Sequence, residues 1–196
     1  EQNQLEMIYV LTELMESTSD ETGKHIRRVA ESSRLLALYH ESLTDEDADI
    51  LFHAAPMHDI GKITIPHSIL HKPGKLTEDE FAIMKTHTSR AFKILQNSKR
   101  KYTKAAAIIA HQHHEKWDGS GYPQGLKGQD IHIYGRIVGL IDVFDALMHK
   151  RVYKEAWSLE DTLDYIRKHS SSQFDPYLVS ILLEHIDEFV AISDQN

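Results

Sequence analysis

Residues 137–146 read IVGLIDVFDA, an apolar run that is interrupted by Asp142 and Asp145. The run lies inside a helix that we predict from about Ile133 to Met148. A carboxylate in the middle of an apolar helix is costly to bury unless it is paired or bound to a cation. We therefore expect Asp142 at a cation site in the middle of the fold. For Asp145 we prefer a structural role, such as a hydrogen bond to a loop.

Helical periodicity dominates the rest of the chain as well, and no run of alternating β-branched residues is long enough to build a sheet. Thr44 with Asp47, and Thr77 with Glu80, have the spacing of capping boxes, which start helices. Further helices are predicted over residues 4–16, 25–40, 44–59, 77–96, 102–114, 159–169 and 176–189. Glycines and prolines make 60–76 and 117–133 loop-rich. The fold class is therefore all-α, a bundle of about seven to eight helices.

The composition is that of one globular domain. The 196 residues suffice for one sizeable core, and 41% apolar with 27% charged residues excludes wholesale disorder. There are no cysteines, which excludes disulfides and thiolate metal sites and fits a reducing cytoplasm. No apolar run approaches the ~20 residues of a membrane helix, so we expect no membrane insertion.

The net charge of −8 argues against a nucleic acid polymer as partner, because such binding needs a broad basic surface. A small anionic substrate remains compatible with this charge, because bound divalent cations reverse the local sign of a site.

Fourteen histidines are the one compositional anomaly. Several have acidic neighbours: Glu21 and His25 share a helix face, and His58 directly precedes Asp59. Imidazole and carboxylate together suit zinc, iron or manganese more than calcium. Such residues can hold two or three ions, which supply a hydroxide nucleophile and clamp the oxygens of a phosphoryl transfer.

Three motifs carry a family resemblance. The strings HDIGKITIPHSILHKPGKLTEDEF (58–81), HHEKWDGSGYPQGLKGQDI (113–131) and RIVGLIDVFDAL (136–147) resemble the HD-GYP family. That family is a branch of the HD phosphohydrolase superfamily that hydrolyses cyclic dinucleotides, chiefly cyclic di-GMP. The resemblance covers roughly residues 18–190. It implies an HD-domain-like bundle with a central metal cluster.

The resemblance also implies a set of metal ligands, with Asp59 bridging two ions and Glu21 serving a third. The eight implied ligands are Glu21, His25, His58, Asp59, His87, His113, His114 and Asp142. Two or three divalent ions are expected, iron or manganese before zinc. His111 lies near this set, and we expect it to be no ligand. The remaining histidines are interpreted as ordinary surface or core residues.

Substrate contacts follow from the same resemblance. Lys62 would act with His58 and Asp59 in catalysis and would contact a substrate phosphate. Tyr122 belongs to the GYP triplet at the pocket mouth, and Arg151 and Lys154 match a segment that holds phosphates. Val152 replaces the proline common in that segment, without removing a ligand.

By the same resemblance, the predicted function is a phosphodiesterase in which a metal-bridging hydroxide cleaves cyclic di-GMP to pGpG, with the end product left open between pGpG and GMP. Three alternatives stay open: a preference for cyclic GMP-AMP, a sensor that binds a cyclic dinucleotide with little turnover, and an HD phosphohydrolase acting on nucleoside mono- or triphosphates.

The predicted organisation has three parts. Residues 1–17 form an amphipathic linker or dimerisation helix, 18–190 the phosphodiesterase domain and 191–196 a tail. Because the chain begins with Glu1, we expect it to be a fragment of a longer protein. The apolar stripe of the predicted 4–16 helix suggests an upstream regulatory domain or a homodimer through that helix.

Overall fold

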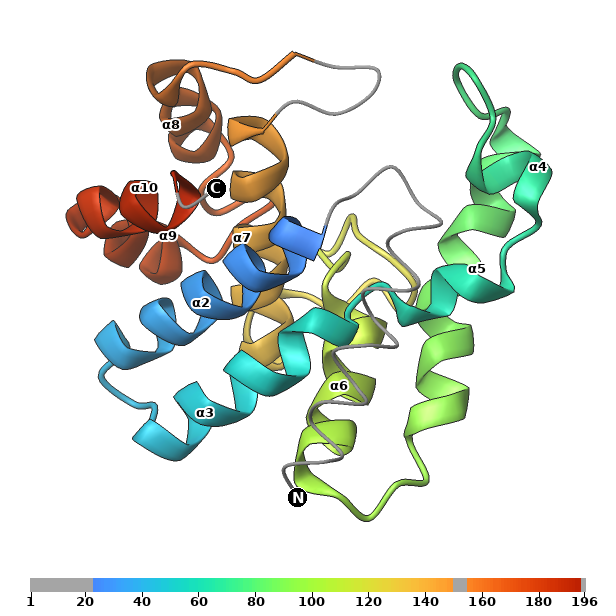
Figure 1. Cartoon of the computed structure of the whole chain (residues 1–196), viewed down its shortest axis with the longest axis horizontal. Helices are drawn as coiled ribbons and strands as arrows, with labels where there is room; N and C mark the ends of the chain where they lie inside the picture. The colour runs from blue at the N-terminus through green and yellow to red at the C-terminus, as the bar shows by residue number, and fades with distance from the viewer. Residues whose placement is uncertain (1–22, 150–154, 195–196) are drawn as a thin grey trace.

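The computed structural model describes residues 23–149 and 155–194, and within these ranges the chain is helical and contains no β-strand. Four helices build the centre: α2 (Gly23–Tyr39), α3 (Asp45–Ala54), α6 (Lys101–Gln112) and α7 (Ile133–Met148). Both α2 and α6 pack on α3 and on α7. In Figure 1 the gold α7 runs through the middle of the molecule. The predicted all-α class is confirmed.

The other helices flank this centre on two sides (Figure 1). On one side, α5 (Glu78–Leu95) packs on α6 and follows the short α4 (His67–Leu70). On the other side, α8 (Leu159–Lys168), α9 (Pro176–Glu184) and α10 (Ile186–Ser193) pack on α7 or α2. Three 3₁₀ helices lie in the connections: η1 (Ala55–Met57), η2 (Ile60–Thr64) and η3 (Gly128–Asp130).

The core explains why the 137–146 run is so apolar. Ile137, Ile141 and Phe144 of α7 are buried against Leu51 of α3 and Ile109 of α6, among others. Each such side chain contributes roughly 1.5–3 kcal/mol through burial. A helix surrounded by other helices needs apolar residues on most of its circumference, which the sequence of α7 provides.

Both predicted capping boxes are present. The Thr44 hydroxyl accepts from the Asp47 backbone N–H at 3.2 Å, and the Asp47 carboxylate accepts from the Thr44 N–H at 2.8 Å. Thr77 and Glu80 repeat this arrangement with the same two distances, 3.2 and 2.8 Å. The starts of α3 and α5 are therefore encoded locally.

The predicted helix over 44–59 was wrong at its end, because α3 stops at Ala54. Pro56 has no N–H to continue the α-helical ladder, and the chain tightens into η1. As a result, His58 and Asp59 lie in a turn between two 3₁₀ helices instead of in the last turn of an α-helix.

The predicted helix over 176–189 is interrupted at His185, whose ring stacks on Tyr39 of α2 with 3.5 Å between ring centres. The break lets α10 return to α2 and bury Phe189 completely. With this break and with α4, the described residues contain nine α-helices instead of the predicted seven to eight. The predicted 4–16 helix lies outside the described residues.

Candidate metal centre

Seven of the eight predicted metal ligands lie in the described residues, and they form two adjacent groups. The first group is Asp59, His87, His113 and His114; the second is His25, His58 and Asp142. Within each group, one ligand atom per residue lies within 4.8 Å of all the others. The eighth predicted ligand, Glu21, lies outside the described residues.

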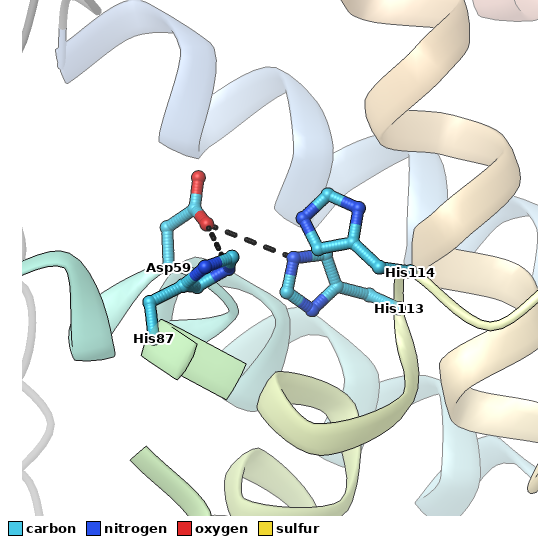
Figure 2. Close-up of side chains that lie close together, drawn as sticks. All are labelled: Asp59, His87, His113 and His114. Carbon is cyan, nitrogen blue, oxygen red and sulfur yellow. Dashed lines mark ion pairs between the residues drawn. The ribbon is translucent and has the colours of Figure 1, made fainter. Parts of the chain in front are cut away.

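The first group joins the turn after η1 to α5 and to the end of α6 (Figure 2). The Oδ1 atom of Asp59 lies 3.3 Å from His87 Nε2 and 3.6 Å from His113 Nε2. The His114 ring lies beside the His113 ring, with 4.0 Å between their centres. Figure 2 shows the His87 and His113 rings directed at the Asp59 carboxylate.

The second group joins α2 and α7 to the same turn. The Oδ1 atom of Asp142 lies 3.6 Å from His25 Nε2 and 3.8 Å from His58 Nε2. The side chain of Asp142, at the centre of the apolar helix, therefore faces two imidazoles.

Asp59 connects the two groups through its two oxygens. While Oδ1 faces His87 and His113, Oδ2 lies 3.3 Å from His58 Nε2 in the second group. The same Oδ2 lies 2.6 Å from Lys62 Nζ. A carboxylate with one oxygen toward each group has the geometry of a bridging ligand.

The imidazole protons are placed by hydrogen bonds at Nδ1. The Nδ1 atoms of His58, His87 and His113 donate to the carbonyls of Ala55 at 2.9 Å, Met84 at 2.7 Å and Ile109 at 3.0 Å. Carbonyl oxygens only accept, so Nδ1 carries the proton. The lone pair of Nε2 is thereby directed into the cluster, as in metal-ligating histidines.

The facing atoms are buried but lack hydrogen bonds. Within the described part of the chain, Nε2 of His58, His87 and His113 and Oδ1 of Asp59 make no hydrogen bond of acceptable geometry. Buried polar atoms without partners are rare and need an explanation. Because the unbonded atoms are imidazole nitrogens and a carboxylate oxygen facing one another, they fit a divalent transition metal.

The electrostatics of the cluster also suit a cation. Burial would raise the pKa of Asp59, but Lys62 and His58 hold it well below its usual range. Burial would lower the pKa of His58, but the carboxylates of Asp59 and Asp142 raise it to about 10. Burial lowers the pKa of His113. Burial, together with the neighbouring His113, lowers the pKa of His114 well below its usual range. The two carboxylates thus favour positive charge between the groups, and a bound divalent cation would supply it while the imidazoles act as neutral ligands.

Two glycines allow the segments to approach closely. A Cβ added at Gly61, in η2, would lie 1.9 Å from the carbonyl oxygen of His87 in α5. A Cβ added at Gly139, in α7, would lie 2.6 Å from the carbonyl oxygen of His113. Both contacts are impossible for a side chain, so the backbones that carry the ligands meet only because these residues are glycines.

Glu115 holds the loop after α6 in place through hydrogen bonds to its backbone. The sequence did not predict this role. This buried carboxylate accepts from the backbone N–H of Gln124 at 2.7 Å and of Leu126 at 3.0 Å. Tyr122, in the loop so held, stacks on His114 with 4.8 Å between ring centres. The only sequence signal was an acid between two histidines and a glycine-rich stretch.

A cavity of about 100 Å³ lies beside the ligands. It is lined by His113, His114 and Asp142 at the cluster, and by Tyr122, Trp117 and Arg136 among the other residues. A small ligand in this cavity would therefore meet the predicted metal ligands and the aromatic loop together.

The other predicted site residues have different outcomes. Lys62 lies at the cluster, as described above. Arg151 and Lys154 lie outside the described residues. His111 stacks on Phe92, with 4.3 Å between ring centres, and belongs to neither group. The carboxylate of Asp145 makes its hydrogen bonds to side chains of α2 instead of to the loop that we expected, while His149, just after α7, lies 3.3 Å from its Oδ1.

Comparison with known proteins identifies the class. Residues 9–178 match the HD domain family, so the chain belongs to that family. Family and cluster together indicate binding of divalent metal. The predicted resemblance and fold class are both confirmed.

Individual relatives are consistent with this assignment. A protein of Vibrio cholerae named 3′3′-cGAMP-specific phosphodiesterase 2 is 50% identical over 188 residues, which cover 95% of this chain and 36% of the relative. A cyclic di-GMP phosphodiesterase response regulator of Xanthomonas campestris is 42% identical, over 93% of this chain and 48% of its own length. This chain thus spans about a third to a half of these relatives.

A solved structure shows the same fold. The crystal structure of a cyclic GMP-AMP-specific phosphodiesterase of V. cholerae superposes with a TM-score of 0.71 at 19% identity, over 98% of this chain and 51% of that one. Within the described residues, no helix is long and apolar enough to cross a membrane.

Proposed function

We propose that this chain is a metal-dependent phosphodiesterase that hydrolyses cyclic di-GMP to pGpG, with further cleavage giving GMP. The observation that carries the proposal is the convergence of seven imidazoles and carboxylates into two groups that share Asp59. The names of relatives that are 42% to 50% identical support the substrate class.

The expected centre holds iron or manganese. The two groups support two ions, with Asp59 between them, and Glu21 would serve a third. Bound divalent cations would supply a nucleophile at neutral pH and stabilise the charge that develops on the phosphoryl group.

The remaining residues would bind and orient the substrate. Lys62 is partly exposed, at 24% of its side chain, and lies beside Asp59, so it can reach a non-bridging phosphate oxygen from the cluster side. Tyr122 would close the pocket mouth over His114. Arg151 and Lys154 would neutralise the phosphates, because cations stabilise charge that grows in the transition state.

A second candidate substrate is 3′3′-cyclic GMP-AMP. The specific observation in its favour is that the 50% identical relative carries that name. Both substrates contain the same phosphodiester linkage, so the residues at the cluster would serve both.

The decisive experiment is hydrolysis by anaerobically purified protein with Fe²⁺ or Mn²⁺, with equal concentrations of the two cyclic dinucleotides and product chromatography. Formation of pGpG supports the proposal, and selective loss of cyclic GMP-AMP supports the second candidate. Tight binding of both without product would replace the proposal with the sensor function. Preferential turnover of an added nucleoside triphosphate would replace it with the general phosphohydrolase function.

Arg151→Ala tests the proposed phosphate contact. Loss of one cation at the phosphates should raise KM at least about tenfold, because a hydrogen bond to a charged group contributes about 1.5–3 kcal/mol. The metal content should remain that of the wild type. Steady-state kinetics and elemental analysis measure the two effects, and an unchanged KM would remove Arg151 from the substrate site.

Glu21→Ala tests the number of ions. If Glu21 ligates a third ion, elemental analysis of the anaerobically purified variant should show a loss of about one ion per chain relative to the wild type. The other ions keep all their own ligands and should remain. An unchanged ion count would mean that Glu21 serves only as an acid near the start of a helix.

We also propose that the 18–190 domain works in the cytoplasm, joined through residues 1–17 to an upstream regulatory module or to a second copy of itself. The greater length of the relatives supports a multidomain protein. Size-exclusion chromatography with light scattering, on chains with and without residues 1–17, measures the dimer.

A further inference from the structure

A buried carboxylate next to the metal centre has no role in the function proposed above. Asp145 follows Asp142 by three residues in α7 and is 5% exposed. Its Oδ2 accepts from His25 Nδ1 at 2.6 Å. Arg28 donates to both oxygens, from Nε to Oδ1 at 2.6 Å and from Nη2 to Oδ2 at 3.0 Å. The imidazole of His149 approaches Oδ1 at 3.3 Å.

This arrangement sets His25 apart from other histidines of the cluster. His58, His87 and His113 donate from Nδ1 to a backbone carbonyl three or four residues earlier, which their own local backbone supplies. His25 donates instead to a side chain 120 residues later in the sequence, on another helix. The tautomer and the ring orientation of His25 therefore depend on the contact between α2 and α7.

Arg28 completes this contact. Its guanidinium fork occupies both oxygens of Asp145, which pairs the buried charge and leaves the carboxylate one orientation. Arg28 and His25 lie three residues apart on α2, so one carboxylate receives both side chains from the same helix face. The hydrogen bonds from His25 and Arg28 also keep the pKa of Asp145 below its usual range, although burial would raise it.

We propose that Asp145 is a positioning residue for the second metal group: it holds His25 with Nε2 toward Asp142, and Arg28 fixes the carboxylate in place. A carboxylate behind a metal-ligating imidazole orients the ring and increases its basicity. This inference rests on the proposed metal centre, and it predicts that Asp145 acts on one of the two groups only.

Asp145→Asn is a sharp test because neither orientation of the amide fits. With its NH₂ group at the Oδ2 position, asparagine would face the donors of His25 and Arg28. With the NH₂ group at the Oδ1 position, it would face the Nε–H of Arg28. The variant should therefore lose either the Nδ1–H tautomer of His25 or the hydrogen bonds that Arg28 donates to residue 145.

The readout is the number and affinity of bound Mn²⁺ ions, measured by the electron paramagnetic resonance of free Mn²⁺ during anaerobic titration. We expect Asp145→Asn to weaken one ion about 10–100-fold, the usual effect of losing such a supporting carboxylate. The affinity of the ion in the His87 group should remain within about twofold.

Asp175→Asn is the matched control. Asp175 is similarly buried, at 6% exposure, and pairs with an arginine, Arg136, but it caps α9 instead of holding a histidine. It should keep wild-type affinity for every ion.

A second variant separates positioning from stability. Arg28→Met with Asp145→Leu removes both charges, so no unpaired charge stays buried, while His25 still loses its acceptor. It should show the same selective weakening. If Asp145→Asn and the double variant both bound every ion with wild-type affinity, the role of Asp145 would be overturned but the proposed function would stand. Equal weakening of all ions in the double variant would have the same consequence. A wild-type chain that binds no Mn²⁺ would overturn the proposed function as well.

Discussion

Asp59→Ala is expected to lower kcat/KM for the cyclic dinucleotide at least about a thousandfold, or roughly 4 kcal/mol of transition-state stabilisation. The reason is its position between the two groups, with Oδ1 toward His87 and Oδ2 toward His58. Loss of the shared carboxylate would weaken the ions of both groups, and elemental analysis should find a loss of more than one ion per chain relative to the wild type. Substitution of a residue that ligates in one group only would remove only one ion.

The variant should remain folded. The imidazoles of His58, His87 and His113 keep their Nδ1 hydrogen bonds to backbone carbonyls, so these rings do not depend on the Asp59 carboxylate for their positions. Asp49→Ala provides the control, because Asp49 lies in α3 at the surface and bonds to Tyr102, away from the cluster. Full metal content and activity in Asp59→Ala, with a normal circular dichroism spectrum, would refute the assignment of the centre.

Gly61→Ala should have the second large effect, although it changes no ligand. The added Cβ would lie 1.9 Å from the His87 carbonyl oxygen, and that backbone atom cannot rotate away. Either η2 or α5 must move, at a cost of about 3 kcal/mol. For a chain of this size, we expect a fall in Tm of roughly 6–12 °C. His87 would also move away from Asp59, so metal content in the first group should fall.

Gly74→Ala is the control for this prediction. Gly74 has a φ of 131°, so alanine strains the backbone there, but no atom lies within 4 Å of the added Cβ. Its metal content should be normal even if its Tm falls slightly. If Gly61→Ala matched the wild type in both Tm and ion content, the close approach of η2 and α5 could not be what holds the first group together.

The ends of the helices show how far local signals reach. The capping boxes at Thr44 and Thr77 were predicted correctly, because each involves only four consecutive residues. The ends of α3 and α9 were not: Pro56 was overlooked as a helix breaker, and the break at His185 accompanies a stack on Tyr39 from another helix.

The metal centre shows the same difference between features that local sequence predicts and features that depend on tertiary contacts. The motifs indicated which residues would meet, and the described seven do meet. The support behind them could not be predicted, since the partners of His25 and Glu115 are either 120 residues away or backbone atoms of an irregular loop. Asp145 was placed correctly as a structural residue, but its bond to α2 instead of a loop depends on how α7 packs.

The amino-acid sequence by itself determined the helical class, the central place of the 137–146 run and the chemical nature of the donors, because periodicity and residue type act over a few neighbouring positions. Only the tertiary structure decided that the donors divide into two groups, that Asp59 lies between them, and that Asp145 holds His25. These facts are distances between segments far apart along the chain, and such distances are set by how the helices pack against one another.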